Sequence, residues 1–140
     1  MRSTSVRSFF DTNLLVYTDD LDSPLKAERA LTLLREHGIA GTGALSTQVL
    51  QEYFVTTTRK LGTAAEHARR KVELFAQLNL VPIGLDNILG AIDLHRLHQL
   101  SFWDALIVES ALRARCAVLY TEDLQHGQRI NGVEVVNPFA

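Results

Sequence analysis

Two short runs in this sequence, one partly apolar and one fully apolar, each stop at a polar segment that carries an acid. Val6-Arg7-Ser8-Phe9-Phe10 is followed by Asp11-Thr12-Asn13, and Ala117-Val118-Leu119-Tyr120 is followed by Thr121-Glu122-Asp123. Short apolar runs bounded by turn-forming residues are typical of buried strands. We therefore predict a strand over 6–10 that ends in a turn and another over 117–120, each with an acidic side chain just beyond its carboxyl end.

Between these runs the apolar residues recur at helical spacing. Ser23-Pro24 predicts a helix start, because Ser is favoured at the N-cap and Pro at the first helical position, and Gly38 suits its end. Further helices are predicted over 47–61, from 63 or 64 to 78, over 86–99 and over 102–115, and further strands around 44–45, over 80–83 and over 133–136. Strands that alternate with helices require crossover connections. The sequence therefore predicts a three-layer α/β/α domain with five short, mostly parallel strands.

Length and composition exclude several classes of protein. A chain of 140 residues is expected to form one domain over 1–140, and 46% hydrophobic with 21% charged residues exclude intrinsic disorder. A net charge of −2 argues against a protein that coats nucleic acid or anionic lipid, and the single Cys116 excludes a disulfide framework or a thiolate-rich zinc site. No apolar run approaches the roughly 20 residues of a membrane span. We expect a cytoplasmic protein that does not associate with membranes.

Four acids are candidates for a shared site. Asp11 and Asp123 follow strands, where ligands bind in open α/β sheets. Asp104 falls on the apolar side of the helix predicted over 102–115, and Glu52 borders the apolar stripe of the helix over 47–61. Each acid has an ordinary alternative role: turn or helix cap for Asp11 and Asp123, a capping box with Ser101 for Asp104, and solvated surface for Glu52. Their joint occurrence favours one site.

Other polar residues are interpreted in relation to these acids. Thr12, Asn13 and Thr121 adjoin them and are candidates to orient water or phosphate, with plain turn chemistry as the alternative. Glu109 and Arg113 are predicted to form a solvent-facing pair four residues apart on their helix.

Four converging carboxylates need a counter-charge, because their mutual repulsion raises their pKa values. Mg²⁺ or Mn²⁺ prefers carboxylate oxygen and water, and usually brings phosphate groups into its coordination shell. Zinc suits the sequence less well, since His95 and His98 lie three apart on one helix without a further ligand motif. The acids therefore predict a hard divalent cation.

These motifs together resemble a known family. The matching segments are Phe10-Asp11-Thr12-Asn13, Glu52, Ser101-Phe102-Trp103-Asp104-Ala105 and Leu119-Tyr120-Thr121-Glu122-Asp123-Leu124. In this order and at this chain length they resemble a PIN domain, and the chain is most similar to the toxin subunit of VapBC-type toxin–antitoxin pairs. The likeness covers nearly the whole chain and all four acidic positions.

The resemblance implies a fold, an activity and partners. The sheet order would be 3-2-1-4-5, which sets the first and fourth strands side by side. The activity would be Mg²⁺- or Mn²⁺-dependent endonucleolytic cleavage of RNA, with Asp11, Glu52, Asp104 and Asp123 as metal ligands. The partners would be a cognate antitoxin protein that inserts a segment into the cleft and a second copy in a homodimer. Independently of the resemblance, helices 25–37 and 47–61 are candidates for the dimer surface, because both carry apolar residues in excess of one stripe.

Because the net charge of the chain is −2, contacts to RNA are expected from a local cluster of basic residues. The segment from Arg59 to Lys71 contains five basic residues and a single acid, Glu66; the basic residues are Arg59, Lys60, Arg69, Arg70 and Lys71. They are candidates for a basic rim that attracts RNA phosphates. The alternative is that they are ordinary solvated residues on helix surfaces. Tyr53 and Trp103 are predicted to be core residues by their helical spacing, and base stacking is the alternative.

Three rival functions remain open at this point. A phosphate-accepting receiver domain needs a lysine late in the chain, and the only lysines are Lys26, Lys60 and Lys71. A non-catalytic PIN-like scaffold or RNA-binding domain would have no need of all four acids. A DNA-directed or general nuclease would use the same acids, since only contacts to the 2′-OH distinguish the two sugars.

Overall fold

The computed structural model describes residues 4–140. Its sheet has the order β3-β2-β1-β4-β6-β5. The strands are β1 Ser8–Phe10, β2 Gly43–Ser46, β3 Asn79–Val81, β4 Val118–Tyr120, β5 Arg129–Ile130 and β6 Val133–Val136. The helices are α1 Thr12–Tyr17, α2 Pro24–Ala40, α3 Thr47–Lys60, α4 Ala65–Phe75, α5 Leu85–His98 and α6 Phe102–Arg113.

The α/β class and the strand order are confirmed, with one correction to the strand count. The five predicted strands are β1, β2, β3, β4 and β6, all paired in parallel in the order that the resemblance implied. A sixth strand, β5, pairs antiparallel with β6. Asn131 and Gly132, which join β5 to β6, have φ values of 49° and 94°. An Asn-Gly pair with two positive φ angles favours a tight hairpin, so this signal was present in the sequence although the two-residue strand was too short to show a pattern.

A further correction concerns the segment after β1, which forms a helix where a turn was predicted. The side chain of Asp11 accepts a hydrogen bond from the backbone N–H of Thr12, and Asp11 is the N-cap of α1. Asp is a favoured N-cap residue because its carboxylate satisfies free N–H groups of the first turn. The helix α2 also continues past Gly38 to Ala40. Its C-cap is Gly41, whose φ of 74° is the left-handed value that glycine adopts most readily.

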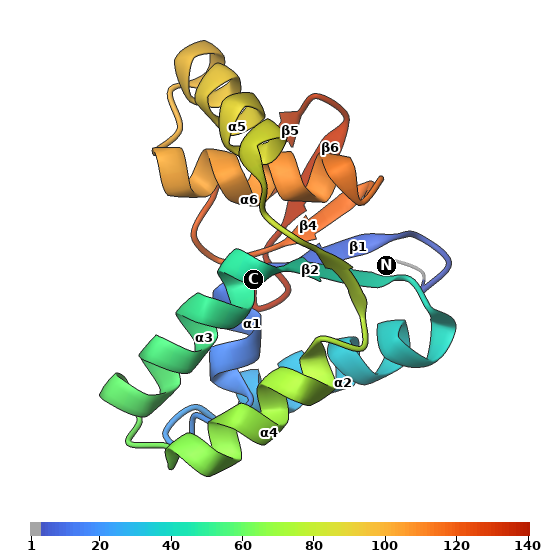
Figure 1. Ribbon diagram of the computed structural model, residues 1–140. Coiled ribbons are helices and arrows are strands. Elements are labelled where there is room, and N and C mark those ends of the chain that lie inside the picture. The colour runs from blue at the N-terminus through green and yellow to red at the C-terminus, as the bar shows by residue number, and fades with distance from the viewer. Residues whose placement is uncertain (1–3) are drawn as a thin grey trace.

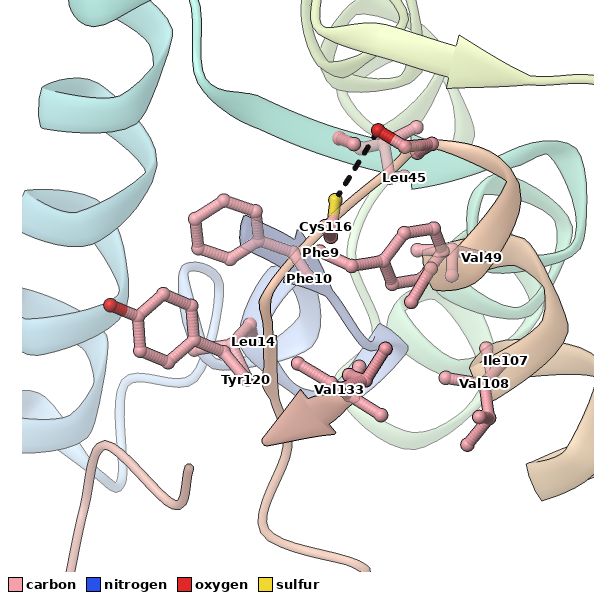
Figure 2. Packing of buried hydrophobic residues seen from close by; sticks show 14 of the residues in the cluster. Phe9, Phe10, Leu14, Leu45, Val49, Ile107, Val108, Cys116, Tyr120 and Val133 are labelled. Atoms are coloured by element: carbon pink, nitrogen blue, oxygen red, sulfur yellow. Dashed lines mark hydrogen bonds between the residues drawn. The ribbon is translucent and has the colours of Figure 1, made fainter. Parts of the chain in front are cut away.

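The helices cover both sides of the sheet. In Figure 1, α5 and α6 lie above β1 and β2, and α1 to α4 lie below them. The strand β1 is at the centre, and all three of its residues are buried. Figure 2 shows the rings of Phe9 and Phe10 on opposite sides of β1, with Phe10 beside Tyr120 of β4 and Phe9 towards Val49 of α3. The buried core thus fixes the two central strands whose ends carry acids.

Within residues 4–140, no helix combines the length and the apolar character needed to cross a membrane.

Candidate functional site

The strand order reverses between β1 and β4. From β1 the chain adds β2 and β3 on one side of the sheet, and β4 and β6 lie on the other side. The two strands pair in register from Ser8 with Val118 to Phe10 with Tyr120, so they end at the same level. Asp11 then donates its backbone N–H to the carbonyl of Tyr120 at 3.0 Å. A crevice beyond the strand ends at such a reversal is where open α/β sheets bind ligands.

Asp11 is the buried acid of this crevice. Its residue is 5% exposed, and its two carboxylate oxygens accept hydrogen bonds from the N–H of Thr12 at 2.6 Å and the hydroxyl of Thr121 at 2.8 Å. The pKa of Asp11 is raised from 3.8 to about 7: burial is the largest cause, the charges of Asp123 and Glu52 add to the rise, and the two hydrogen bonds oppose it. The carboxylate therefore lies within electrostatic reach of two other acids in a poorly solvated position.

Glu52 is brought to Asp11 by α3 and is held by a residue of α1. The hydroxyl of Thr12 donates to Glu52 Oε1 at 2.7 Å, while the N–H of the same residue binds Asp11. On the other side, Gln48 Nε2 lies 3.4 Å from Glu52 Oε2, one turn earlier on α3. Thr12 thus joins two of the predicted acids through its backbone N–H and its hydroxyl.

Asp123 is held by the other two predicted orienting residues. Asn13 Nδ2 donates to Asp123 Oδ2 at 3.1 Å and to Thr121 Oγ1 at 3.2 Å. Thr121 is fully buried, and its hydroxyl also accepts from the N–H of Asp123 at 3.0 Å while donating to Asp11. This hydroxyl therefore uses its donor and both its lone pairs to connect the two strand-end acids.

Asp104, the fourth predicted acid, belongs to a different element, α6. It is half-buried in the first turn of α6, where its backbone N–H donates to Ser101 Oγ at 3.1 Å, the N-cap bond that the sequence suggested. Within residues 4–140, no hydrogen bond or ion pair joins the Asp104 carboxylate to the other three acids. The connection is indirect, since Gln48 Nε2 lies 3.4 Å from both the Trp103 carbonyl and Glu52.

The chemistry of these donors suits a hard cation, although they do not form a complete cage. Among residues 4–140, no three His, Cys, Asp or Glu side chains are grouped so as to hold a metal ion together. Mg²⁺, however, is usually bound by one or two carboxylates and keeps several waters. Cations near the site are engaged elsewhere: Lys26 pairs with Glu122 at 3.0 Å and Lys71 with Asp19 at 2.7 Å. The buried carboxylate of Asp11 thus lacks a counter-charge from these lysines.

The basic segment is divided by these pairings. Arg59, Lys60 and Arg70 are exposed, and Arg69 is exposed but pairs with Glu73 at 3.0 Å. Lys71 is different, because its side chain is 16% exposed and its ammonium binds Asp19 inside the fold. Four of the five basic residues predicted for RNA therefore face solvent.

The structure reveals two features that the sequence analysis missed. Tyr53 is fully buried as predicted, but Trp103 is 61% exposed, so its predicted core position is wrong. It is in the first turn of α6, where the ring faces a cleft instead of a neighbouring layer. Gln48, one turn before Glu52, was not singled out, although its i,i+4 spacing places both on one helix face.

Comparison with known proteins gives one family. The family model of the PIN domain matches residues 8–129. A search of curated proteins found no match.

Several solved structures share the fold. A toxin–antitoxin complex from Klebsiella pneumoniae aligns with a TM-score of 0.68 and 23% identity over 94% of this chain and 97% of that chain. The sarcin-ricin loop cleaving toxin VapC20 of Mycobacterium tuberculosis aligns with a TM-score of 0.67 and 18% identity. The alignment covers 83% of this chain and 91% of that chain. VapBC2 from Rickettsia felis, bound to a DNA fragment from its promoter, aligns with a TM-score of 0.61 and 21% identity. The alignment covers 91% of this chain and 96% of that chain.

Proposed function

Because the chain belongs to the PIN domain family, we propose that it is a divalent-metal-dependent endoribonuclease and the toxin of a toxin–antitoxin pair. The observation that carries this proposal is the buried Asp11, with a raised pKa, between Glu52 and Asp123 at the reversal of the sheet. A buried carboxylate beside two like charges is the environment in which a divalent cation gains most. Cleavage is proposed to take place in the cytoplasm.

Asp11, Glu52, Asp104 and Asp123 are proposed to hold Mg²⁺ or Mn²⁺, with water completing the coordination. When bound, such an ion lowers the pKa of water and offsets the negative charge of the phosphodiester. Neighbouring side chains fix three of these acids, since Thr121 orients Asp11, Thr12 joins Asp11 to Glu52, and Asn13 holds Asp123. Outer residues of this kind typically change metal affinity or activity by about 10- to 100-fold when removed.

The toxin role and the antitoxin partner rest on the structural relatives. A toxin–antitoxin complex and two VapBC-type proteins have this fold along nearly all of the chain. A cognate antitoxin protein is proposed to bind this chain and cover the acidic crevice, and a second copy is proposed to form a homodimer. Arg59, Lys60, Arg69 and Arg70 are proposed to attract RNA phosphates, whereas Lys71 has Asp19 as its partner.

The test is cleavage of RNA by the purified protein. We expect a panel of structured and single-stranded RNAs to be cut with Mg²⁺ or Mn²⁺, and cutting to stop with EDTA and in Asp11→Asn. Asp93→Asn, at an exposed position on α5, is the matched control and should cut normally. Sequencing the ends of the cut RNA would give the cleavage sequence.

The same assay decides against the proposal if the RNAs stay intact under these conditions. A non-catalytic PIN-like RNA-binding or scaffold protein would then be the better description. Equal cutting of DNA with the same sequences would instead indicate a general nuclease, because the metal chemistry does not distinguish the sugars.

A further inference from the structure

The most exposed aromatic side chain of the described residues lies beside the proposed active site. Trp103 is 61% exposed, although large aromatic side chains usually bury most of their surface. It precedes Asp104 directly and lines an open cleft of about 490 Å³ together with Thr12 and Glu52. The remaining lining residues are Gln48, Gln51, Val55 and Thr56. The cleft therefore begins at the acids and has an indole on its wall.

The protein holds Trp103 in place without covering it. Its ring meets Phe102 edge to face, with the centroids 5.1 Å apart and the planes at 79°. Its carbonyl oxygen lies 3.4 Å from Gln48 Nε2, which lies at the same distance from Glu52 Oε2. One amide thus connects the backbone beneath the indole to an acid of the site.

Gln48 also has an acceptor that the free protein does not use. Among residues 4–140, Gln48 Oε1 and Asn13 Oδ1 are the buried side-chain atoms without a hydrogen-bond partner. Turning the Gln48 amide over would only set its oxygen against two other acceptors, Glu52 and the Trp103 carbonyl. Unsatisfied buried oxygens are rare in folded proteins and indicate where water or a ligand group is expected. Both of these residues adjoin the acids of the site.

We propose that Trp103 is the stacking platform for an unpaired nucleobase of the RNA, placed so that the adjoining phosphate faces the acids. This inference rests on the proposed function and adds to it a residue that positions the substrate base beside the acids. Every base has a π-face, so an exposed indole binds unpaired bases with little sequence preference, whereas a base stacked inside a duplex cannot reach it. The basic side chains would attract phosphates, and Trp103 would select RNA with an accessible base.

Trp103 is the only tryptophan of the chain, so its fluorescence reports this contact directly. Asp11→Asn protein, which should not cut, is titrated with an eight-nucleotide single-stranded RNA and with the same RNA annealed to its complement. We expect saturable quenching of the Trp103 emission by the single strand and at most a small change with the duplex. Unchanged emission at RNA concentrations that saturate binding, measured by the anisotropy of a dye-labelled RNA, would overturn the proposal.

Variants give a second readout. In the Asp11→Asn background, Trp103→Leu should weaken binding of the labelled single strand by about 5- to 150-fold, the range for loss of one stacked base. Trp103→Phe should retain most of the affinity, because Phe also stacks. Phe54→Leu is the matched control, since Phe54 is 37% exposed but lines a different groove, and it should bind as the parent does. Equal affinity of the Leu and Phe variants would contradict stacking.

The outcomes separate this inference from the proposed function. Quenching by single-stranded RNA that the wild-type protein does not cut would retain the stacking site and reject the nuclease. Cutting of RNA without quenching would retain the nuclease and reject the stacking site.

Discussion

Asp11 shows how one position can combine a cap, a core residue and a candidate ligand. As N-cap of α1 its carboxylate accepts the Thr12 N–H, and as part of the central strand ends it is almost fully buried. A helix N-terminus stabilises negative charge, but burial and two neighbouring acids oppose it, and the balance raises the pKa of Asp11 to about 7. The folded protein therefore disfavours the ionised carboxylate of Asp11, which is the form that would bind a metal.

The stability of the metal-free protein should depend on the ionisation of Asp11. Because its pKa rises from the ordinary 3.8 to about 7 on folding, the native protein binds this proton more tightly than the unfolded chain. The stability contributed by Asp11 therefore falls as the pH rises from about 4 to about 7, by at most about 4 kcal/mol. In EDTA, Asp11→Asn should raise the melting temperature by several degrees at pH 8 and have little effect at pH 4.

Two further measurements complete this prediction. Asp93→Asn, an exposed acid on α5, should leave the melting temperature unchanged at both pH values. Added Mg²⁺ or Mn²⁺ should stabilise the wild-type protein at pH 8 more than Asp11→Asn. A gain from Asp11→Asn that is the same at pH 4 and pH 8 would show that the ionised carboxylate is not the cause.

At the scale of elements, Asp19 joins three helices that support Glu52. It follows α1, and its carboxylate accepts from Tyr53 at 2.6 Å and Thr57 at 2.8 Å on α3 and from Lys71 at 2.7 Å on α4. Burial alone would raise the pKa of Asp19, but these three donors lower it overall. The stability that it contributes is therefore present above pH 4 and lost as the pH falls through the lowered pKa.

Removing this carboxylate should destabilise the fold. Asp19→Ala leaves the Lys71 ammonium, 16% exposed, without its partner, and we expect a loss of about 2 to 3 kcal/mol in urea unfolding at pH 7. Glu73→Gln breaks the exposed Arg69–Glu73 pair on α4 and should cost at most about 0.5 kcal/mol. Similar costs for the two variants would mean that the Asp19 cluster behaves as surface charge.

The packing of α5 on α6 depends on a glycine and a buried acid. Glu109 does pair with Arg113, but it is only 7% exposed, so the prediction that its side chain faces solvent is wrong. Its Oε1 accepts from Asn87 on α5 at 3.0 Å and from Arg113 at 3.1 Å. Spacing along one helix cannot reveal this, because the neighbouring helix decides which face is covered. At Gly90 of α5, a Cβ would lie 2.7 Å from Glu109 Oε2.

Gly90→Ala should therefore destabilise the protein, although alanine is the better helix former. Because Asn87 and Arg113 hold Glu109, its carboxylate cannot simply move aside, and we expect a net loss of about 1 to 2 kcal/mol in urea unfolding. Gly38→Ala on α2 is the control: its nearest neighbour would be Leu78 at 3.7 Å, so a gain of up to about 1 kcal/mol is expected. A gain from both variants would show that the α5–α6 contact adapts to the methyl group.

At the scale of the whole molecule, α5 presents an apolar outer face. Leu85, Ile88, Leu89 and Ile92 are 69%, 38%, 51% and 39% exposed on successive turns. A helix that is apolar on both its inner and outer faces is normally covered on both. Its first turn carries Asp86 and its last turn Arg96, so two antiparallel copies would set opposite charges together and make the surface self-complementary, as a two-fold interface requires.

The proposed homodimer is therefore expected to use α5. In equilibrium sedimentation the wild-type protein should be dimeric, and Leu89→Glu should shift it towards monomer by placing a charge in the apolar face. Val55→Glu, at a 47% exposed position on α3, tests the surface suggested by the sequence over 47–61 and should leave the dimer intact. Dissociation by Val55→Glu with no effect of Leu89→Glu would assign the dimer to α3.

The sequence by itself determined the α/β class, the order of all elements except α1 and β5, and the acids after β1 and β4, because strands, caps and helical spacing are local properties of the chain. Only the tertiary structure decided which acids meet. Register between β1 and β4 sets Asp11 and Asn13 beside Thr121, and α3 brings Glu52 to Thr12 from forty residues away. It likewise buried Glu109, covered most of the Lys71 side chain and exposed Trp103, since burial depends on which neighbour covers a face, and helical spacing contains no information on that neighbour.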